Sequence, residues 1–271
     1  MKTLILPNGD KISIIDRLTA DYIYDEIYVD KVYLKRGINV KDGDVILDVG
    51  ANIGLFSRFI STQANNLKIF TFEPIPAIFN VLEANLKDIN ADIKNFNIGL
   101  GKKEKTIDIT YYPKCSGDSA IIPFDWDLKV DLYLQNYEET ICKDMPQAIN
   151  IPEDKRKGLV EAGLKTIYRG KIVQCQIRPL SQIIQENNIK HINLMKIDAE
   201  NYEWQVLAGI KDDDWEKIEQ IAMEVHTHIK GGANLMNELT NLLEKKGFKV
   251  YEGEESRETI MGVYMLYAKK E

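Results

Sequence analysis

Cysteine is scarce in this sequence, and the few cysteines are not spaced for a shared site. Only three of the 271 residues are cysteine, and no two have the Cys-x-x-Cys spacing of a zinc or redox site. Cys115, Cys142 and Cys175 are far apart and odd in number, so we expect reduced thiols rather than a disulfide framework. This usage favours a cytoplasmic protein.

Long apolar runs are also lacking. No stretch of about 18 apolar residues occurs, so the sequence predicts no membrane-spanning helix. The apolar run within residues 1–10 is too short for a signal peptide. Hydrophobic residues nevertheless make up 44% of the chain, which is enough to build a sizeable core.

Clusters of basic residues are absent as well. The chain has 35 lysines and arginines against 42 acidic residues, and its formal net charge is −7. Nucleic acids and anionic membranes are bound by dense positive surfaces. We therefore expect neither as a partner.

A glycine is missing where dinucleotide-binding proteins require one. Residues 45–50 are apolar enough for a buried parallel strand, and Gly50 and Gly54 suit the turn into a following helix. Asn52 takes the middle position, where the Gly-x-Gly-x-x-Gly fingerprint needs glycine so that the backbone can approach a pyrophosphate. A side chain there crowds a pyrophosphate but can hydrogen-bond a smaller group, such as an amino-acid carboxylate.

Two acidic residues at strand ends complete this pattern. Asp48 lies at the end of the first strand, where a carboxylate suits a bound ammonium group. Glu73 ends the next apolar run and follows Asp48 at a distance close to the roughly 20 residues expected for a carboxylate on ribose hydroxyls. An amino acid joined to a nucleoside is S-adenosylmethionine (SAM), so the turn and the two carboxylates together predict SAM as the cofactor.

Alternating strands and helices indicate the fold class. Helices are expected after the first two strands, near residues 55–63 and 78–86. This alternation predicts an α/β fold with a doubly wound parallel sheet and right-handed crossovers. Asn97 ends the third strand, which commonly borders adenine in such folds, although mere packing explains it equally well. The apolar runs predict strands near residues 45–50, 68–73, 93–98, 191–198, 218–225, 248–251 and 260–268.

Two segments depart from the alternation. Residues 1–40 form an N-terminal extension, with a hairpin over 1–15 and a tyrosine-rich helix over 20–34 that either covers the cofactor or packs on the sheet. Residues 106–180 form a charged, largely helical insertion. An excursion of this length is typical of a lid or substrate-recognition element, with a docking platform for a partner as the alternative. We expect a single domain over residues 1–271.

Ionisable residues recur at the ends of the later strands. Asp198 and Glu200 follow the fourth strand, and Glu224 and His226 end the fifth. Ligands of doubly wound sheets bind outside the carboxyl ends of the strands. These four residues and the two carboxylates described above are therefore expected to converge on one crevice.

His226 is the best candidate for a general base. The ordinary histidine pKa lies near neutral pH, and a base speeds proton loss from a hydroxyl acceptor by about 10²–10⁴-fold. Glu224 shares a strand face with His226, and either Glu224 or Glu200 could orient the imidazole. His226 could instead only hydrogen-bond the backbone at a strand end.

A metal site is the alternative use of these residues. The alternation Glu224-x-His226-x-His228, together with Asp198 and Glu200, could bind a divalent ion. Because SAM and a base explain the carboxylates equally well, we predict no metal.

Several motifs together resemble the FkbM-type SAM-dependent methyltransferases. The similarity is greatest to the O-methyltransferase modules of polyketide synthases and hybrid peptide assembly lines, and it covers nearly the whole chain. The run Glu-Pro-Ile-Pro at 73–76 is more telling than the glycine turn. The matching motifs lie at residues 24–28, 32–38, 48–56, 72–79, 194–198, 206–210, 214–215 and 223–226.

The resemblance implies a Rossmann-like sheet of seven strands, with the last strand antiparallel and a lid over the acceptor. It implies SAM-dependent methylation of a hydroxyl on a polyketide, peptide or sugar, presented as a free small molecule or tethered to a carrier protein. The family usually has an acidic-Gly or Lys-Ser-Glu pattern after Asp198, so either Glu200 or Glu203 could hold its acidic position here. Because the sequence begins at Met1 and ends at Glu271 with nothing attached, we expect a free-standing tailoring enzyme of natural-product or sugar biosynthesis.

Other functions stay open at this point. A nucleotide-dependent oxidoreductase on the same general fold would bind NADH, and Asn52 argues against it. A metal-assisted methyltransferase would act on a nitrogen or carboxylate acceptor. A non-catalytic scaffold protein would keep the pocket and would not need His226.

Overall fold

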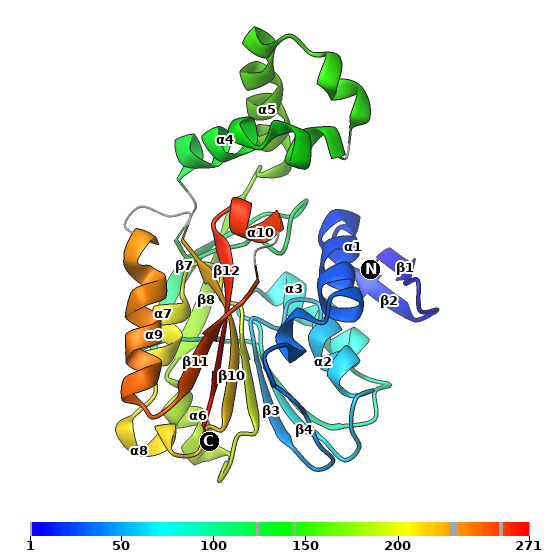
Figure 1. Cartoon of the computed structure of the whole chain (residues 1–271). Helices are drawn as coiled ribbons and strands as arrows, with labels where there is room; N and C mark the ends of the chain where they lie inside the picture. The colour runs from blue at the N-terminus through cyan, green and yellow to red at the C-terminus, as the bar shows by residue number, and fades with distance from the viewer. Residues whose placement is uncertain (1, 123–124, 144, 228–231, 255–256, 271) are drawn as a thin grey trace.

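The central element is a seven-stranded sheet with the order β11-β12-β10-β9-β3-β4-β5 (Figure 1). The computed structural model describes residues 2–122, 125–143, 145–227, 232–254 and 257–270. Strands β10, β9, β3, β4 and β5 pair in parallel, and β12 runs antiparallel to both β10 and β11. The predicted fold class, including the antiparallel last strand, is confirmed. The strands are β3 (Val45–Val49), β4 (Lys68–Phe72), β5 (Asp92–Phe96), β9 (Leu194–Ile197), β10 (Gln220–His226), β11 (Lys249–Glu252) and β12 (Val263–Lys269).

Helices bury both faces of the sheet, because nearly every side chain of its central strands is apolar. Ile46 of β3 packs in one cluster with α2 and α3, whereas Leu47 and Val49 pack in a second cluster with α6, α7, α8 and α9. The helices are α2 (Leu55–Ile60), α3 (Pro76–Asn85), α6 (Leu180–Glu186), α7 (Glu203–Leu207), α8 (Asp212–Trp215) and α9 (Leu235–Lys245), with the short turns η5 (Gly232–Asn234) and α10 (Arg257–Ile260) near the C-terminus.

The two-residue period of the strands gathers polar side chains on the α2 face. Asp48 lies two residues from Ile46 and is the register partner of Lys196 on β9. Lys196 is in turn the partner of Ala222 on β10, and Glu224 follows two residues later. The buried polar groups therefore lie along one face, at the carboxyl ends of three adjacent strands.

The N-terminal extension begins with the predicted hairpin, in which β1 (Lys2–Ile5) pairs antiparallel with β2 (Lys11–Ile14). The helix predicted over 20–34 is broken into α1 (Arg17–Tyr24), a π-helical turn η1 (Asp25–Val29) and a 3₁₀ turn η2 (Val32–Leu34). The break occurs at Lys31, whose φ of +50° is left-handed and incompatible with a continuing helix. This change of direction carries η2 towards β10.

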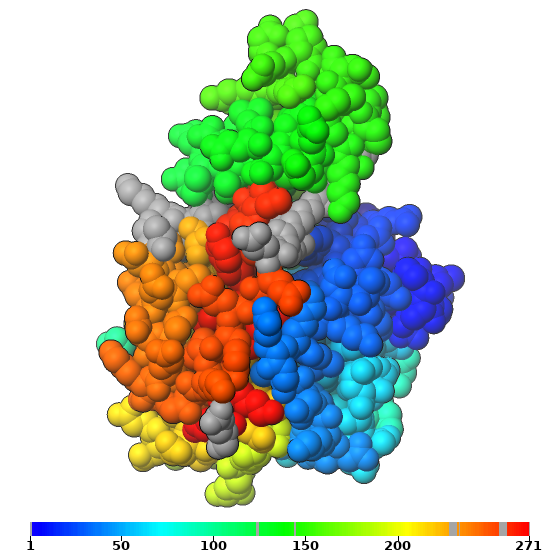
Figure 2. Space-filling model, in the orientation of Figure 1, coloured from blue at the N-terminus to red at the C-terminus, as the bar shows by residue number. Residues whose placement is uncertain are grey.

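The insertion stands on a small second sheet in which β8 (Lys171–Arg178) lies between β6 (Gly99–Leu100) and β7 (Lys105–Tyr111). The sequence did not predict β8, whose partner β7 lies some 60 residues earlier. Between β7 and β8, the helical segments of the insertion form a lobe above the body (Figures 1 and 2). This lobe has its own apolar cluster, which includes Val130, Tyr137, Val160 and Leu164. Its helical segments are α4 (Trp126–Gln135), η3 (Glu138–Cys142), η4 (Pro146–Asn150) and α5 (Glu153–Ile167).

The cysteine thiols and helix lengths agree with two expectations from composition. Cys115, Cys142 and Cys175 are all free thiols. Among the described residues, no helix combines the length and apolarity that crossing a membrane would require.

Candidate active site

The turn after β3 depends on two glycines in the left-handed region. Gly50 has a φ of +72°, and a Cβ atom there would lie 1.7 Å from the carbonyl oxygen of Asp198. Gly54 has a φ of +87°, and its Cβ would meet the Leu86 side chain, at the end of α3, at 3.1 Å. Gly50 therefore lets β3 approach the end of β9, which is the point where the strand order reverses and ligands of such sheets bind.

The Asn52 side chain folds back onto the backbone of this turn and does not project away from it. Its φ is +47°, which asparagine tolerates better than most residues, and its Oδ1 accepts a hydrogen bond from the Ile53 N–H at 2.7 Å. The Asn52 N–H donates to Oε2 of Glu73 at 3.2 Å. The residue thus couples the glycine turn to the end of β4.

Glu73 and Asn97 form one bonded unit beyond β4 and β5. Glu73 is 5% exposed, and its other oxygen accepts from the Ile75 N–H at 2.9 Å. Burial raises the pKa of Glu73 to about 7 against the opposing effect of these two backbone donors. The Asn97 side-chain amide donates to the carbonyl oxygens of Glu73 and Pro74. Each carboxylate oxygen of Glu73 retains capacity to accept a further hydroxyl donor.

A buried lysine links the first strand end to the fourth. Lys196 is 3% exposed, and its ammonium donates to the Gly50 carbonyl at 2.7 Å, while lying 3.5 Å from Asp48 Oδ1 and 3.4 Å from Asp198 Oδ2. Burial alone would lower the pKa of Lys196, but the charges of Asp198 and Asp48 raise it. Asp48 also accepts from the Ser57 hydroxyl at 2.7 Å. The ammonium that Asp48 faces is therefore one the protein itself provides.

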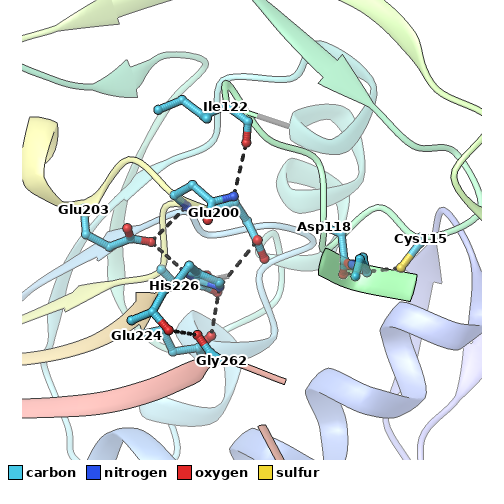
Figure 3. A network of polar contacts seen from close by, with 12 residues as sticks. Cys115, Asp118, Ile122, Glu200, Glu203, Glu224, His226 and Gly262 are labelled. Carbon is cyan, nitrogen blue, oxygen red and sulfur yellow. Dashed lines mark hydrogen bonds and ion pairs between the residues drawn. The ribbon is translucent and has the colours of Figure 1, made fainter. Parts of the chain in front are cut away.

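His226 lies among three carboxylates (Figure 3). Its Nδ1 is 2.7 Å from Oε1 of Glu203, and its Nε2 is 3.4 Å from Glu200 and 3.8 Å from Glu224. Burial alone would lower the pKa of His226, but the charges of Glu200 and Glu203 raise it well above its usual range. Glu224 does share the strand face of His226, as predicted.

The loop after β9 places two carboxylates on opposite sides of the imidazole. Glu200 and Asn201 are consecutive left-handed residues, with φ of +45° and +70°, a conformation that costs free energy and is typical of functional sites. The Asn201 N–H donates to Glu203 Oε1 at 3.1 Å, and its side chain donates to the Ile122 carbonyl of the insertion. Glu203, at the start of α7, is fully buried, and its carboxylate lies next to Nδ1 of His226.

Two residues of the N-terminal extension bond to Glu224. The Tyr33 hydroxyl donates to Glu224 Oε1, and the Glu26 carboxyl also hydrogen-bonds Glu224. Burial and the adjacent Glu224 charge raise the pKa of Glu26 well above its usual range. Burial would likewise raise the pKa of Glu224, but the hydrogen bonds from Glu26 and Tyr33 and the charge of His226 lower it. The opposite directions of these two pKa shifts favour Glu26 as the donor of the hydrogen bond between them.

A small cavity of about 20 Å³ lies between the glycine turn, Lys196 and the N-terminal extension. Its volume is sufficient for about one water molecule. Asp198 Oδ1 is buried nearby with no hydrogen-bond partner among the described residues, and burial raises the pKa of Asp198 to about 6. An unpartnered carboxylate oxygen suits a cationic or N–H-bearing ligand. The cavity lining includes Ile23, Glu26, Ile27, Tyr33, Gly50, Ala51, Asn52, Ile53, Leu55, Phe56, Lys196 and Asp198.

A metal ion would have to compete with the existing proton network. Asp198, Glu224 and His226 can each bring one potential ligand atom within 4.8 Å of the others. However, Glu224 already accepts two hydrogen bonds, and both ring nitrogens of His226 face carboxylates. His228, the third member of the predicted alternation, lies outside the described residues.

All ten predicted site residues lie in two neighbouring groups. One group contains His226, Glu224, Glu200, Asp198 and Asp48, and the other contains Gly50, Asn52, Gly54, Glu73 and Asn97.

Sequence reasoning missed Lys196, Glu26 and Tyr33. A charged residue inside the apolar run 194–197 was the signal for Lys196. Nothing local marks Tyr33, because its partner lies 191 residues away.

The chain is similar to a known family and to several named proteins. A family model described as the methyltransferase FkbM domain matches residues 48–250. The chain is 35% identical to the AMB antimetabolite synthetase AmbE of Pseudomonas aeruginosa over 90% of this chain, but it spans only 11% of that protein. It is 30% identical to the 31-O-demethyl-FK506 methyltransferase FkbM of Streptomyces tacrolimicus, over 92% of this chain and 90% of that protein.

A solved structure shows the same fold. The crystal structure of methyltransferase FkbM from Methylobacillus flagellatus KT superposes with a TM-score of 0.50 at 14% identity, over 88% of this chain and 47% of that chain. The family match covers most of the chain, including the glycine turn and the His226 cluster. The chain therefore belongs to the FkbM family of SAM-dependent methyltransferases.

Proposed function

We propose that this enzyme transfers the methyl group of SAM to a hydroxyl oxygen, with His226 as the general base. The observation that carries the proposal is the position of His226 at the carboxyl end of β10, with Nδ1 on Glu203 and Nε2 facing Glu200 and Glu224. An ionised Glu203 can only accept, so Nδ1 donates and the lone pair of the neutral ring lies on Nε2.

The residues around the glycine turn fit the polar parts of SAM. The unpartnered Asp198 oxygen would hold its amino or sulfonium cation, Lys196 its carboxylate, and Glu73 its ribose hydroxyls, with Asn97 beside the adenine. Gly50, Gly54, Asn52 and Asp48 would shape the turn beneath it. Because the cavity holds about 20 Å³, part of its lining must move to admit a nucleoside.

When bound, SAM supplies an electrophilic methyl group and leaves as the neutral thioether. His226 Nε2 would take the acceptor proton as the oxygen–methyl bond forms, and Glu203, Glu200 and Glu224 would stabilise the resulting imidazolium. Such a base supplies about 10²–10⁴-fold in rate, and the fixed geometry supplies orientation.

The acceptor class follows from the relatives and the insertion. One relative is named for 31-O-demethyl-FK506, and another is an antimetabolite synthetase, so a natural-product acceptor is proposed here, free or tethered to a carrier protein. We assign residues 106–180 to acceptor recognition as a lid, because Asn201 next to the base hydrogen-bonds Ile122 of this insertion. An enzyme of this kind would act on a polyketide, peptide or sugar hydroxyl.

Calorimetric titration with S-adenosylhomocysteine tests the cofactor, with NADH as the competing ligand of an oxidoreductase. Binding of the first and not of the second is expected. Transfer of labelled methyl to hydroxyl acceptors then tests the chemistry. The His226→Ala variant should lose about 10²–10⁴-fold in kcat and keep S-adenosylhomocysteine affinity. Unchanged turnover in this variant would overturn the proposed base, and the exposed His191→Ala variant is the matched control.

A further inference from the structure

The contacts of Glu224 come from a segment outside the family match. Residues 25–34, which comprise η1 and η2 and are called here the N-terminal strap, precede the matched residues 48–250. Glu26 and Tyr33 of this strap both hydrogen-bond Glu224. Glu224, one of the two carboxylates that face His226 Nε2, is thus held by residues that precede the matched segment.

The strap holds Tyr33 firmly in place. Tyr33 is 2% exposed, and its ring packs edge-on against Phe56 with centroids 5.3 Å apart. The ammonium of Lys196 lies 5.3 Å from the same ring. The Tyr267 hydroxyl donates to the Val32 carbonyl at 2.6 Å and fixes the adjacent backbone. This packing does not require the Tyr33 hydroxyl, so its bond to Glu224 can be removed without removing the ring.

Glu224 is surrounded by both donors and charges. Glu26 from η1 and Tyr33 from η2 donate to it from the strap. The other titratable groups that face it are Lys196 from β9, Asp198 and Glu200 from the following loop, His226 from β10 and Tyr267 from β12. Two neutral donors on an otherwise acidic cluster favour the ionised form of the carboxylate they bond.

We propose that Glu26 and Tyr33 are positioning residues for methyl transfer, which hold Glu224 as an ionised acceptor beside His226. Glu224 then stabilises the imidazolium from the Nε2 side, as Glu203 does from the Nδ1 side. Glu26 acts in its protonated form, as a donor. The inference rests on the proposed role of His226 as the base.

The first experiment follows the titration of His226 by NMR in the full chain, without cofactor or acceptor. The chain has three histidines, so His191→Gln and His228→Gln variants assign the signal. Tyr33→Phe should make Glu224 harder to ionise and lower the pKa of His226 by about half to one unit, a three- to tenfold change in the protonation equilibrium. Tyr28→Phe is the matched control, because that hydroxyl in the same strap has no hydrogen-bond partner among the described residues.

Variants of Glu26 show whether this residue acts on Glu224 as a hydrogen-bond donor or as a charge. Glu26→Gln keeps an N–H donor to Glu224 and cannot ionise, so it should titrate like the wild type. Glu26→Ala removes the donor and should shift His226 as Tyr33→Phe does. A Glu26→Gln variant that behaves like Glu26→Ala would overturn the proposal, as would a Tyr33→Phe titration equal to that of Tyr28→Phe.

Turnover provides the second readout. Tyr33→Phe and Glu26→Ala should lower kcat about tenfold with the KM for SAM unchanged, while Glu26→Gln and Tyr28→Phe stay within twofold. A rise in KM with unchanged kcat would assign the strap to cofactor binding alone and overturn the positioning role. If His226→Ala retains full turnover while the NMR shifts occur, the proposed base fails but the link from strap to Glu224 stands, so the two failures are distinguishable.

Discussion

Nδ1 of His226 lies 2.7 Å from Oε1 of Glu203, although one residue ends a strand and the other begins a helix. Both side chains are almost entirely removed from solvent. An ionised carboxylate accepts and does not donate, so opposite ionised Glu203 the neutral ring carries its proton on Nδ1. The arrangement directs Nε2 towards the side of the imidazole where Glu200 and Glu224 lie.

Glu203→Gln tests this contact. The amide retains the shape and an acceptor oxygen but loses the charge that stabilises the imidazolium. We expect kcat to fall about 10- to 100-fold, part of the 10²–10⁴ that the base supplies, with S-adenosylhomocysteine affinity unchanged. Glu219→Gln removes the charge of the exposed His191–Glu219 pair and serves as the control, with no change expected. Equal rates for wild type and Glu203→Gln would contradict an orienting role.

The pH dependence should follow the raised pKa of His226. Protonated His226 cannot accept a proton, so kcat/KM should rise with pH along a limb centred above 6.5, the ordinary histidine value. Glu203→Gln should move this limb to lower pH, because a charge that raises the His226 pKa is lost. A limb at or below 6.5 in the wild type would contradict the geometry. Rate measurements from pH 6 to 10 decide between these outcomes.

The raised pKa of His226 also predicts how the stability of the fold depends on pH. A group whose folded pKa lies above its unfolded value stabilises the fold fully below the unfolded pKa and loses this contribution as pH rises through the folded pKa. The free energy of unfolding should therefore decrease as pH rises above 6.5, and the decrease should be smaller in His226→Gln. Urea denaturation at pH 6 and pH 9 measures the free energy of unfolding of the wild type and of His226→Gln. An equal decrease in both proteins would contradict the raised pKa of His226.

Gly50→Ala should disrupt the turn after β3. The substitution places a Cβ 1.7 Å from the Asp198 carbonyl oxygen and requires a left-handed φ of +72° from alanine. We expect a lower melting temperature and no S-adenosylhomocysteine binding. Gly158→Ala in α5 is the matched control, since its Cβ would meet no atom within 4 Å, and it should stabilise the helix by about 0.5–1 kcal/mol. Normal binding by Gly50→Ala would contradict the close approach of β3 and β9.

The insertion can be removed at its base. Tyr111 and Lys171 are register partners on the antiparallel strands β7 and β8, so an Asn-Gly turn can replace residues 112–170. If the insertion is a lid for the acceptor, this variant should bind S-adenosylhomocysteine and lose methyl transfer to the acceptor. Retained transfer with the same KM for the acceptor would contradict the assignment and favour a docking platform.

Chelation tests the proton network against a metal centre. Overnight dialysis against EDTA should leave the rate of methyl transfer unchanged, because protons and hydrogen bonds already occupy the Glu224 and His226 side chains. A loss of activity that Mg²⁺ or Zn²⁺ restores would instead assign Asp198, Glu224 and His226 to a metal.

The sequence by itself determined the fold class and most of the strand ends. Apolar runs followed by Asp48, Glu73, Asp198 and His226 are local signals, because burial of a parallel strand on both faces requires an apolar run and a polar residue marks where it ends. The glycine turn was a local signal in the same way, because Gly50 and Gly54 each adopt a left-handed conformation that favours glycine. These motifs indicated the family resemblance, and the match to the family model confirms it.

Only the tertiary structure decided how the charges pair. Whether Glu200 or Glu203 holds Nδ1 depends on two left-handed residues that turn the chain between them. Tyr33 and Glu224 meet across 191 residues, and no periodicity in either segment reports the other. Local sequence patterns predict which side chains are buried. The partner of a buried charge, however, is set by packing between elements that are distant in the sequence. That packing also determines the protonation states on which the chemistry depends.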